Sequence, residues 1–224
     1  MFVVAEAWRS AFPGACAGIL VVRGADNPAH HPALEEKKRL LEEELRARFA
    51  GQHREAILAL PVIQAYDAYY KRFKKTYHVQ LQLESIVFKG KSIPSVAALV
   101  EVSFMAELKN LLLTAGHDLD ILQFPVTVDV STGDERYTML RGEEQQLKPG
   151  DMFMYDRDGI LTSVLYGLDR RTRITAATRS AFFAVYAPRG IGEQAVREHL
   201  QEIQENILLV SPEAQIERLA VFSA

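Results

Sequence analysis

The sequence predicts an α+β protein in which helices flank layers of mostly antiparallel strands. Apolar residues recur at three- and four-residue steps through much of residues 33–113 and again in 191–208, a spacing typical of helices with one buried face. Between these parts, residues 122–187 hold short apolar segments separated by Gly, Asp and Pro, which favours antiparallel strands. With 224 residues, 48% of them hydrophobic, the chain can bury a sizeable core.

The first elements follow from local patterns. Residues 17–24, AGILVVRG, are a β-branched apolar run between glycines and predict a buried strand. Two prolines make residues 25–33 a loop, and the leucine stripe of residues 34–49 predicts a helix. A second helix is expected to begin near Pro61, because proline is tolerated in a first turn. Residues 79–88, VQLQLESIVF, begin with alternating apolar and polar positions and predict a strand.

The next helix is expected to begin at Pro94 and Ser95, with Val96, Val100 and Phe104 on its buried side. The stretch LTAGHDLD, residues 113–120, then marks a junction in which a turn accounts for the glycine but not for the histidine. The strand-length segments that follow include MFMYD, ILTSVLYG and FFAVYAP, and the last predicted elements are the 191–208 helix and an edge strand in the tail, QIERLAVF.

Composition excludes several protein classes. The formal net charge is −3 and the pI is about 6.1, so the chain lacks an overall basic surface for long nucleic acids. We expect a cytoplasmic protein without a membrane span, because there is one cysteine, no signal-like start and no long apolar run. Clustered metal ligands and nucleotide-binding loops are not visible in the sequence, and we expect neither a metal nor a cofactor. We expect one domain, 1–224, divided into a helical lead-in 28–76, a core 77–190, and a C-terminal helix and tail 191–224.

A basic and aromatic stretch, YYKRFKKTYH, closes the helix predicted from Pro61. Its cations suit phosphates and its rings suit bases, which would make it a nucleic-acid contact. Alternatively, the cations only complement the negative end of the helix dipole and the tyrosines belong to the core. The candidate nucleic-acid residues are Lys71, Arg72, Lys74 and Lys75.

The other candidate site residues lie where helix gives way to strand. His117 is suited to general base chemistry or to orienting a water near neutral pH. Ser103 falls on or beside an apolar stripe, where its hydroxyl must find a partner. For both the alternative is structural: a serine bonded to its own helix, and an exposed histidine in a turn shaped by its aspartates. The candidates on this side are Ser103, His117, Asp118 and Asp120.

A second group of candidates lies in LYGLDRRT, residues 165–172. A glycine beside a tyrosine at a strand end allows close approach by a ligand, and the planar fork of an arginine can hold a carboxylate or phosphate. The alternative is a surface cluster of ion pairs. The candidates here are Tyr166, Gly167, Arg171 and Thr172, with Asp169 and Arg170 beside them.

Three longer stretches of the sequence, taken together and in order, resemble one known family. IPSVAALVEVSFMAELKNLLLTAGHDLD, GDERYTMLRGEEQQLKPGDMFMYD and SVLYGLDRRTRITAATRSAFFAVYAP resemble the tRNA-binding, editing-type (B3/B4-type) domain of the phenylalanyl-tRNA synthetase beta chain, and more closely its free-standing relatives. The similarity covers about residues 77–190. It implies a three-layer fold containing a β-sandwich, with a pocket for an amino acid on a tRNA 3′ end. In the synthetase this domain hydrolyses tyrosine wrongly attached to the phenylalanine tRNA.

This sequence differs from the family at several positions where the synthetase has polar residues. The synthetase's Thr-Asn pair falls at Ser103–Phe104, its editing histidine at Ala115 and its pocket glutamate near Ala184. His117, slightly downstream, substitutes only if the loop turns it inward.

Two functions follow from the resemblance. The first is a free-standing hydrolase acting in trans on the esters of misacylated tRNA, with Ser103 and His117 as catalytic residues in a pocket shared with Tyr166. The second is a non-catalytic module that binds tRNA or an amino acid and has lost the editing chemistry. The expected partners are the tRNA 3′ end or aminoacyl-tRNA and an amino acid in the pocket. ATP-dependent charging is not expected, because the synthetase carries that chemistry in other regions.

Overall fold

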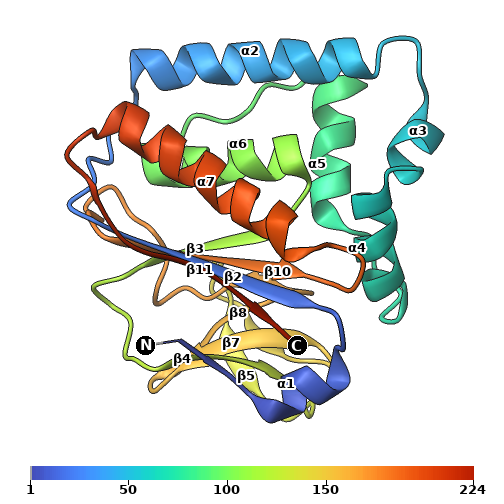
Figure 1. Cartoon of the computed structure of the whole chain (residues 1–224), viewed down its shortest axis with the longest axis vertical. Coiled ribbons are helices and arrows are strands. Elements are labelled where there is room, and N and C mark those ends of the chain that lie inside the picture. Colours follow the sequence, from blue (N-terminus) through green and yellow to red (C-terminus); the bar gives the residue numbers. More distant parts are fainter. Residues whose placement is uncertain (1) are drawn as a thin grey trace.

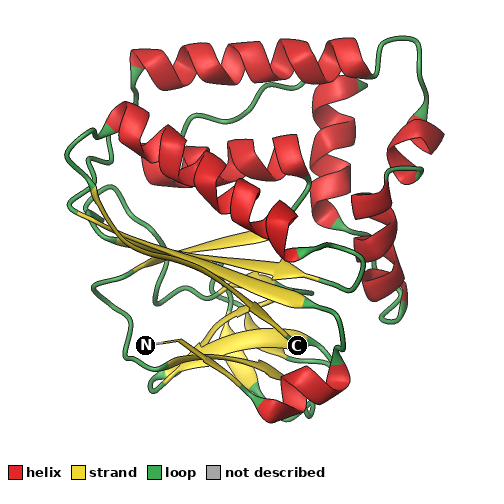
Figure 2. Cartoon of the chain, in the orientation of Figure 1, coloured by secondary structure: helices red, strands yellow, loops and turns green. Residues whose placement is uncertain are grey.

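The computed structural model describes residues 2–224 and arranges them in three layers (Figures 1 and 2). A layer of helices covers one face of a four-stranded sheet, and the other face of that sheet packs on a five-stranded sheet. The strand pairs are antiparallel except for one parallel pair, β1 with β4. The predicted α+β class, with a sandwich of mostly antiparallel strands flanked by helices, is therefore confirmed.

The helices lie mainly in the first half of the chain. They are α1 (Glu6–Ala11), α2 (Pro32–Arg48), α3 (Arg54–Leu58), α4 (Pro61–Lys71), α5 (His78–Val87), α6 (Ala98–Asn110) and α7 (Glu193–Val210). The α2 and α7 helices and the start of α4 lie where their sequence patterns predict them.

The strands form three sheets. They are β1 (Phe2–Val4), β2 (Cys16–Arg23), β3 (Thr114–Asp118), β4 (Val126–Val130), β5 (Arg136–Thr138), β6 (Glu144–Gln146), β7 (Met152–Asp156), β8 (Gly159–Ser163), β9 (Gly167–Leu168), β10 (Ala181–Ala187) and β11 (Gln215–Ser223). The orders are β11-β2-β10-β3 and β1-β4-β7-β8-β9, with β5 and β6 as a separate hairpin. The predicted tail strand is confirmed as the edge strand β11, and the strands predicted around β2, β7, β8 and β10 are also present.

The core lies between the helical layer and the first sheet and continues between the two sheets. Strand β10 is central and every one of its seven residues is buried, which explains its uninterrupted apolar sequence. Helix α7 packs close to β2, because a Cβ added at Gly18 would lie 2.4 Å from Cγ1 of Val196. Glycine at this position thus permits the close approach of helix and sheet.

The prediction of a strand at residues 79–88 is wrong, because this segment is helix α5. Its alternating start is short, and the buried positions Val79, Leu83 and Ile86 follow helical spacing. The helix packs against α2, α3 and α6, so tertiary burial selects the helical face. Leu81, which the strand pattern also counted as apolar, is 45% exposed.

The start of α6 also differs from prediction. The helix begins at Ala98 rather than at Pro94 and Ser95, and Val96, predicted to be buried, is exposed. The backbone N–H of Val96 donates to a Glu101 carboxylate oxygen at 2.6 Å, which satisfies the chain just before the helix.

The segment LTAGHDLD, expected to form a turn, is instead largely the edge strand β3. Its Gly116 and His117 pair with β10, and the turn comes only after Asp118. Strand β1 and helix α1 had no clear signal in the sequence.

Within residues 2–224, no helix combines the length and apolar character that crossing a membrane requires. The same residues hold no group of three or more His, Cys, Asp or Glu side chains placed to bind a metal ion.

Candidate functional site

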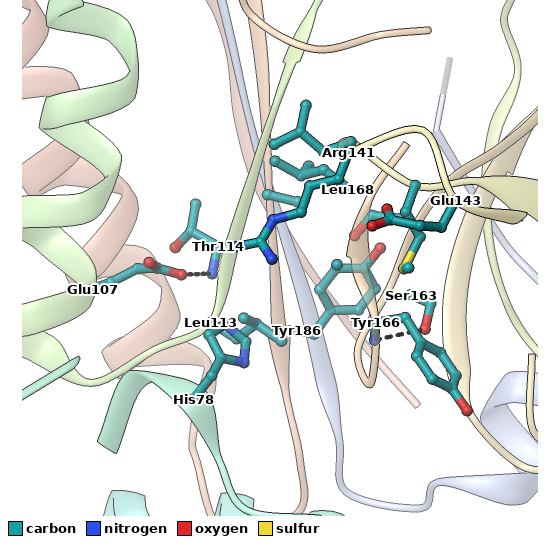
Figure 3. A pocket seen from close by; sticks show the side chains of 15 residues that line it. His78, Glu107, Leu113, Thr114, Arg141, Glu143, Ser163, Tyr166, Leu168 and Tyr186 are labelled. Atoms are coloured by element: carbon teal, nitrogen blue, oxygen red, sulfur yellow. Dashed lines mark hydrogen bonds between the residues drawn. The ribbon is translucent and has the colours of Figure 1, made fainter. Parts of the chain in front are cut away.

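A hollow with polar walls, which we call the edge pocket, opens where β3 and β9, the edge strands of the two main sheets, lie beside the end of α6 (Figure 3). Its volume is about 490 Å³, and pockets that bind small molecules commonly measure about 300–1,000 Å³. The lining residues are His78, Glu107, Leu113, Thr114, Ala115, Met139, Leu140, Arg141, Glu143, Thr162, Ser163, Tyr166, Gly167, Leu168 and Tyr186.

Glu107 supplies a carboxyl group to one wall. It lies in the last turn of α6 and is 7% exposed. One carboxyl oxygen accepts the backbone N–H of Thr114 at 2.7 Å (Figure 3). Burial raises the pKa of Glu107 to about 8, so in the empty pocket the group is mostly neutral at pH 7.

The chain between α6 and β3 is held by two buried tyrosines. The Tyr66 hydroxyl donates to the carbonyl oxygen of Tyr186 and accepts the N–H of Leu113 at 2.8 Å. The Tyr77 hydroxyl donates to the carbonyl oxygen of Leu111 at 3.0 Å, and its ring stacks on that of Tyr66 with a centroid distance of 4.1 Å. These bonds fix the position of the wall from which Glu107 and Thr114 face the pocket.

His78 approaches the pocket from the start of α5. The Tyr70 hydroxyl donates to the carbonyl oxygen of Val164 at 2.6 Å, so the Nδ1–H of His78 donates to that hydroxyl at 3.3 Å. This assignment leaves the Nε2 atom of His78 as a hydrogen-bond acceptor. Burial lowers the pKa of His78 to about 4, with a smaller effect from Lys75, and the ring is therefore neutral at pH 7.

The opposite side of the pocket carries hydroxyl groups. The Tyr186 hydroxyl makes no hydrogen bond of normal geometry within residues 2–224, although Thr162 lies close to it, and burial raises the pKa of Tyr186, so it remains a donor. Ser163 donates to the buried carboxylate of Asp151 and accepts the N–H of Tyr166 at 3.2 Å. Burial raises the pKa of Asp151 to about 6 despite this bond and one from Tyr69. Tyr186 is thus the hydroxyl best placed to take a new partner.

A basic rim adjoins the pocket. The Nζ of Lys75 lies 4.0 Å from the centroid of the Tyr166 ring, a cation–π contact. Burial lowers the pKa of Lys75, and Lys148 nearby lowers it further. Arg141, exposed, extends over the pocket on the side of Thr114 (Figure 3). Tyr166 and Gly167, two of the predicted site residues, lie in the pocket wall, and Gly167 has a φ of +85°, a conformation that favours glycine.

Ser103 lies elsewhere. Its hydroxyl donates to the carbonyl oxygen of Val100 at 2.9 Å, the structural alternative for a serine in a helix. His117 is also outside the lining of the edge pocket. The prediction that Ser103 and His117 share a hollow with Tyr166 is therefore wrong for the described chain, because Ser103 bonds to its own helix and the His117 side chain packs between the sheets.

His117 belongs to what we call the buried network: His117, Thr172, Asp169, Arg171 and Asp156. Its Nδ1–H donates to the Thr172 hydroxyl at 2.8 Å, because that hydroxyl itself donates to Asp169. Arg171 donates to both carboxylate oxygens of Asp156, at 2.7 and 3.2 Å. Burial lowers the pKa of His117 to about 3, with a smaller contribution from Arg171, and Nε2 has no hydrogen-bond partner in the described residues.

The two predicted aspartates shape the turn after β3. Asp118 accepts the backbone N–H of Asp120 at 3.1 Å and the Thr178 hydroxyl at 2.5 Å. Asp120 is exposed and lies 3.5 Å from a guanidinium nitrogen of Arg23. The aspartates thus follow the structural alternative, but the histidine beside them does not, because His117 is fully buried.

The predicted nucleic-acid residues separate into different environments. Lys71 forms a 2.5 Å salt bridge with Asp67, and Lys74 is exposed. The Arg72 guanidinium lies 5.4–5.7 Å from the centroids of three aromatic rings, those of Phe12, Tyr69 and Phe73. Of the four cations, Lys75 is the one that contacts a residue of the edge pocket.

Sequence reasoning missed Glu107, His78, Arg141 and Tyr186. A signal existed for Glu107, a carboxylate inside the apolar run FMAELKNLLL. For Tyr186, inside FFAVYAP, the sequence looks like an ordinary buried strand. His78 closes the stretch YYKRFKKTYH, in which the lysines and the arginine, and not the histidine, were the candidates.

The chain matches no protein-family model and no curated protein. Its fold is similar to a solved structure, an N-terminal fragment of the phenylalanyl-tRNA synthetase beta subunit from Pyrococcus horikoshii, at a TM-score of 0.50 and 10% sequence identity. The likeness covers 100% of this chain and 54% of the fragment, so the chain spans about half the length of that neighbour.

Proposed function

We propose that this chain binds the aminoacyl end of a tRNA in the edge pocket. The observation that carries the proposal is a 490 Å³ hollow lined by apolar side chains together with convergent polar groups, Glu107, His78 and Tyr186. Such a hollow suits an amino acid that is held by a few oriented contacts. The fold similarity to a synthetase beta-subunit fragment and the resemblance of residues 77–190 to its editing-type domain support a tRNA-related ligand.

The rim supports the placement of a nucleic acid. Lys75 sits over Tyr166 at the pocket, and Lys148 lies close enough to affect its pKa. Cations beside a pocket mouth suit the phosphates that precede the terminal nucleotide of a tRNA. The tRNA would thus contact a local basic rim on a chain whose net charge is −3.

The finer form of the proposal is hydrolysis of the aminoacyl ester in trans. Neutral His78 offers an acceptor that can orient a water, and Tyr186 offers a buried donor for the developing oxyanion. In this proposal the catalytic roles move from Ser103 and His117 to the residues of the edge pocket.

Binding without catalysis is the second candidate. It is favoured by the alanines at the positions where the resemblance places polar editing residues. Ala115 lines the pocket, and Ala184 pairs with it across β3 and β10. Both side chains are buried and neither can position a water.

Two measurements test these candidates. Total tRNA should bind at low salt, and the binding should weaken as salt rises, because phosphate contacts release counterions. Deacylation should then be measured on a panel of mischarged tRNAs. Turnover above buffer that falls in both His78→Ala and Tyr186→Phe supports the hydrolase. Salt-dependent binding with no turnover supports the binding module, and no binding at low salt rejects the tRNA proposal.

A further inference from the structure

We infer that the Glu107 carboxyl group recognises the α-ammonium group of the ligand, an inference that rests on the proposed binding of an aminoacyl group. The carboxyl group is built into the pocket wall rather than attached to its surface. It is 7% exposed, and one of its oxygens is held at 2.7 Å by the Thr114 N–H. Figure 3 shows it at the side of the pocket nearest α6.

This carboxyl group lacks a positive partner of its own. Within residues 2–224, its pKa is set by burial and by the Thr114 N–H, and no neighbouring cation contributes. A buried carboxylate without a cation is costly, and the same group paired with one is stabilised. The pocket therefore presents a position that a cationic ligand group completes.

The groups that face Glu107 do not fill this role. Tyr66 and Tyr77 donate their hydroxyl protons to carbonyl oxygens, so neither donates to the carboxyl group. His199, behind Thr114, is fully buried and its pKa is lowered to about 3, so it is neutral at pH 7. His78, on the next wall, is neutral there as well.

Two charged groups stand at the mouth of the pocket. Arg141 and Glu143 are both exposed and line the edge pocket. Arg141 suits an anionic part of the ligand, such as a phosphate, rather than an ammonium group. With Glu107 inside the pocket and Arg141 at its mouth, the cation of the ligand would lie inside and its anions outside. An aminoacyl group on a nucleotide has this arrangement of charges.

The assignment predicts selectivity for a free amine. An α-amino group has a pKa of about 7.7–8.0 and is mostly protonated at pH 7. When it pairs with Glu107, the carboxyl group loses its proton to solvent. Binding at pH 7 should thus release a fraction of a proton approaching one, and acylation of the amine should remove both the contact and the release.

The test uses calorimetry on the full chain with defined probes. These are amino acid amides, 3′-aminoacylamino-3′-deoxyadenosines with a non-hydrolysable amide, and the deamino counterpart of each. Glu107→Gln keeps an acceptor for the Thr114 N–H, and Glu205→Gln is the control because it removes an exposed carboxylate of α7 that lies outside the lining of the edge pocket. Titrations in buffers of different ionisation enthalpy give the proton release.

We expect amines to bind about 10- to 100-fold more tightly than their deamino counterparts, and Glu107→Gln to lose this preference and the proton release while Glu205→Gln keeps both. Equal binding of amines and deamino probes, or an unchanged Glu107→Gln, overturns the inference but leaves the proposed function standing. Amides that bind through Glu107 while adenosine conjugates do not bind support the inference and count against the tRNA function. If no amine binds, the inference falls, and the tRNA binding assay judges the function separately.

Discussion

The edge pocket and the buried network both bring polar, titratable residues together, yet their histidines differ, because His78 lines a 490 Å³ hollow whereas His117 is fully buried. In the buried network, His117, Thr172 and Asp169 bond to one another in a packed interior. In the edge pocket, Glu107 and Tyr186 border a 490 Å³ space. A histidine with a lowered pKa occurs in both regions, so a perturbed pKa by itself does not mark a site. The accessible volume beside the titratable group distinguishes a ligand site from a structural network.

The largest effect is expected from a substitution that breaks the buried network. The Asp156 side chain is fully buried and accepts both Arg171 bonds and the N–H of Gln123 at 2.9 Å. Asp156→Ala leaves these donors without their partner and should lower the free energy of unfolding by about 3–5 kcal/mol in urea denaturation. Asp158→Ala, which changes an exposed neighbouring carboxylate, is the control and should have little effect. A loss below 1 kcal/mol for Asp156→Ala would show that the network is not structural.

The second-largest effect is expected in the stability of the protein at acidic pH. His117 is neutral in the folded protein with a pKa of about 3, against an ordinary value of 6.5, and it faces Thr172 and Arg171, with Asp156 close by. As the pH falls, His117 in the unfolded chain therefore takes up its proton at a higher pH than His117 in the folded protein. The stability contribution is complete above pH 6.5 and is lost as the pH falls toward 3, by about 1.4 kcal/mol per pH unit. His117→Phe should remove this part of the slope between pH 6.5 and 4.5, measured by urea denaturation, and an unchanged slope would contradict the assignment.

The contribution of Glu107 to stability should depend on pH in the opposite direction to that of His117. Its folded pKa of about 8 exceeds the ordinary 4.5, so its contribution is complete below pH 4.5 and is lost as the pH rises through 8. Between pH 5 and 6.5 the wild type should therefore lose about 2 kcal/mol relative to Glu107→Gln. Unfolding curves of the two proteins at these pH values check this. Glu143→Gln, at the exposed rim, should follow the wild type.

A smaller effect is expected at the floor of the pocket. Tyr186→Phe removes a hydroxyl that makes no hydrogen bond of normal geometry in the described chain, so the free energy of unfolding should change by less than about 1 kcal/mol. The same change should reduce ligand binding or deacylation by about tenfold if the hydroxyl contacts the ligand. If the losses in the free energies of unfolding and of ligand binding are equal, Tyr186 acts only as a core residue.

The smallest effect is expected at the rim. Lys75→Ala should lower tRNA affinity by about threefold and reduce the slope of log affinity against log salt by about 1. Filter binding at two salt concentrations measures both. Arg39→Ala, on the exposed face of α2, where the guanidinium pairs with Glu36 and Glu43, is a distant control and should leave the slope unchanged.

Elements with one decisive local pattern were predictable. The leucine stripe of α2 and the continuous apolar run of β10 each match a single structure. Helix α5 was not predictable from its alternating start, because contacts with α2 and α6 decide which of its residues are buried. For the site, Tyr166 and Gly167 were named in advance and line the edge pocket, whereas Glu107 and Tyr186 looked like parts of buried elements.

By itself the sequence determined the α+β class, the central strand and most helices, because hydrophobic periodicity acts over a few neighbouring residues. Only the tertiary structure decided which polar groups face a cavity. Glu107 and Tyr186 lie 79 residues apart in the chain and meet because β3, β10 and the end of α6 pack together. His117, on the same strand as Ala115, is closed in by Thr172 and Phe182. Whether space remains beside a side chain depends on packing between distant segments, which no local pattern encodes.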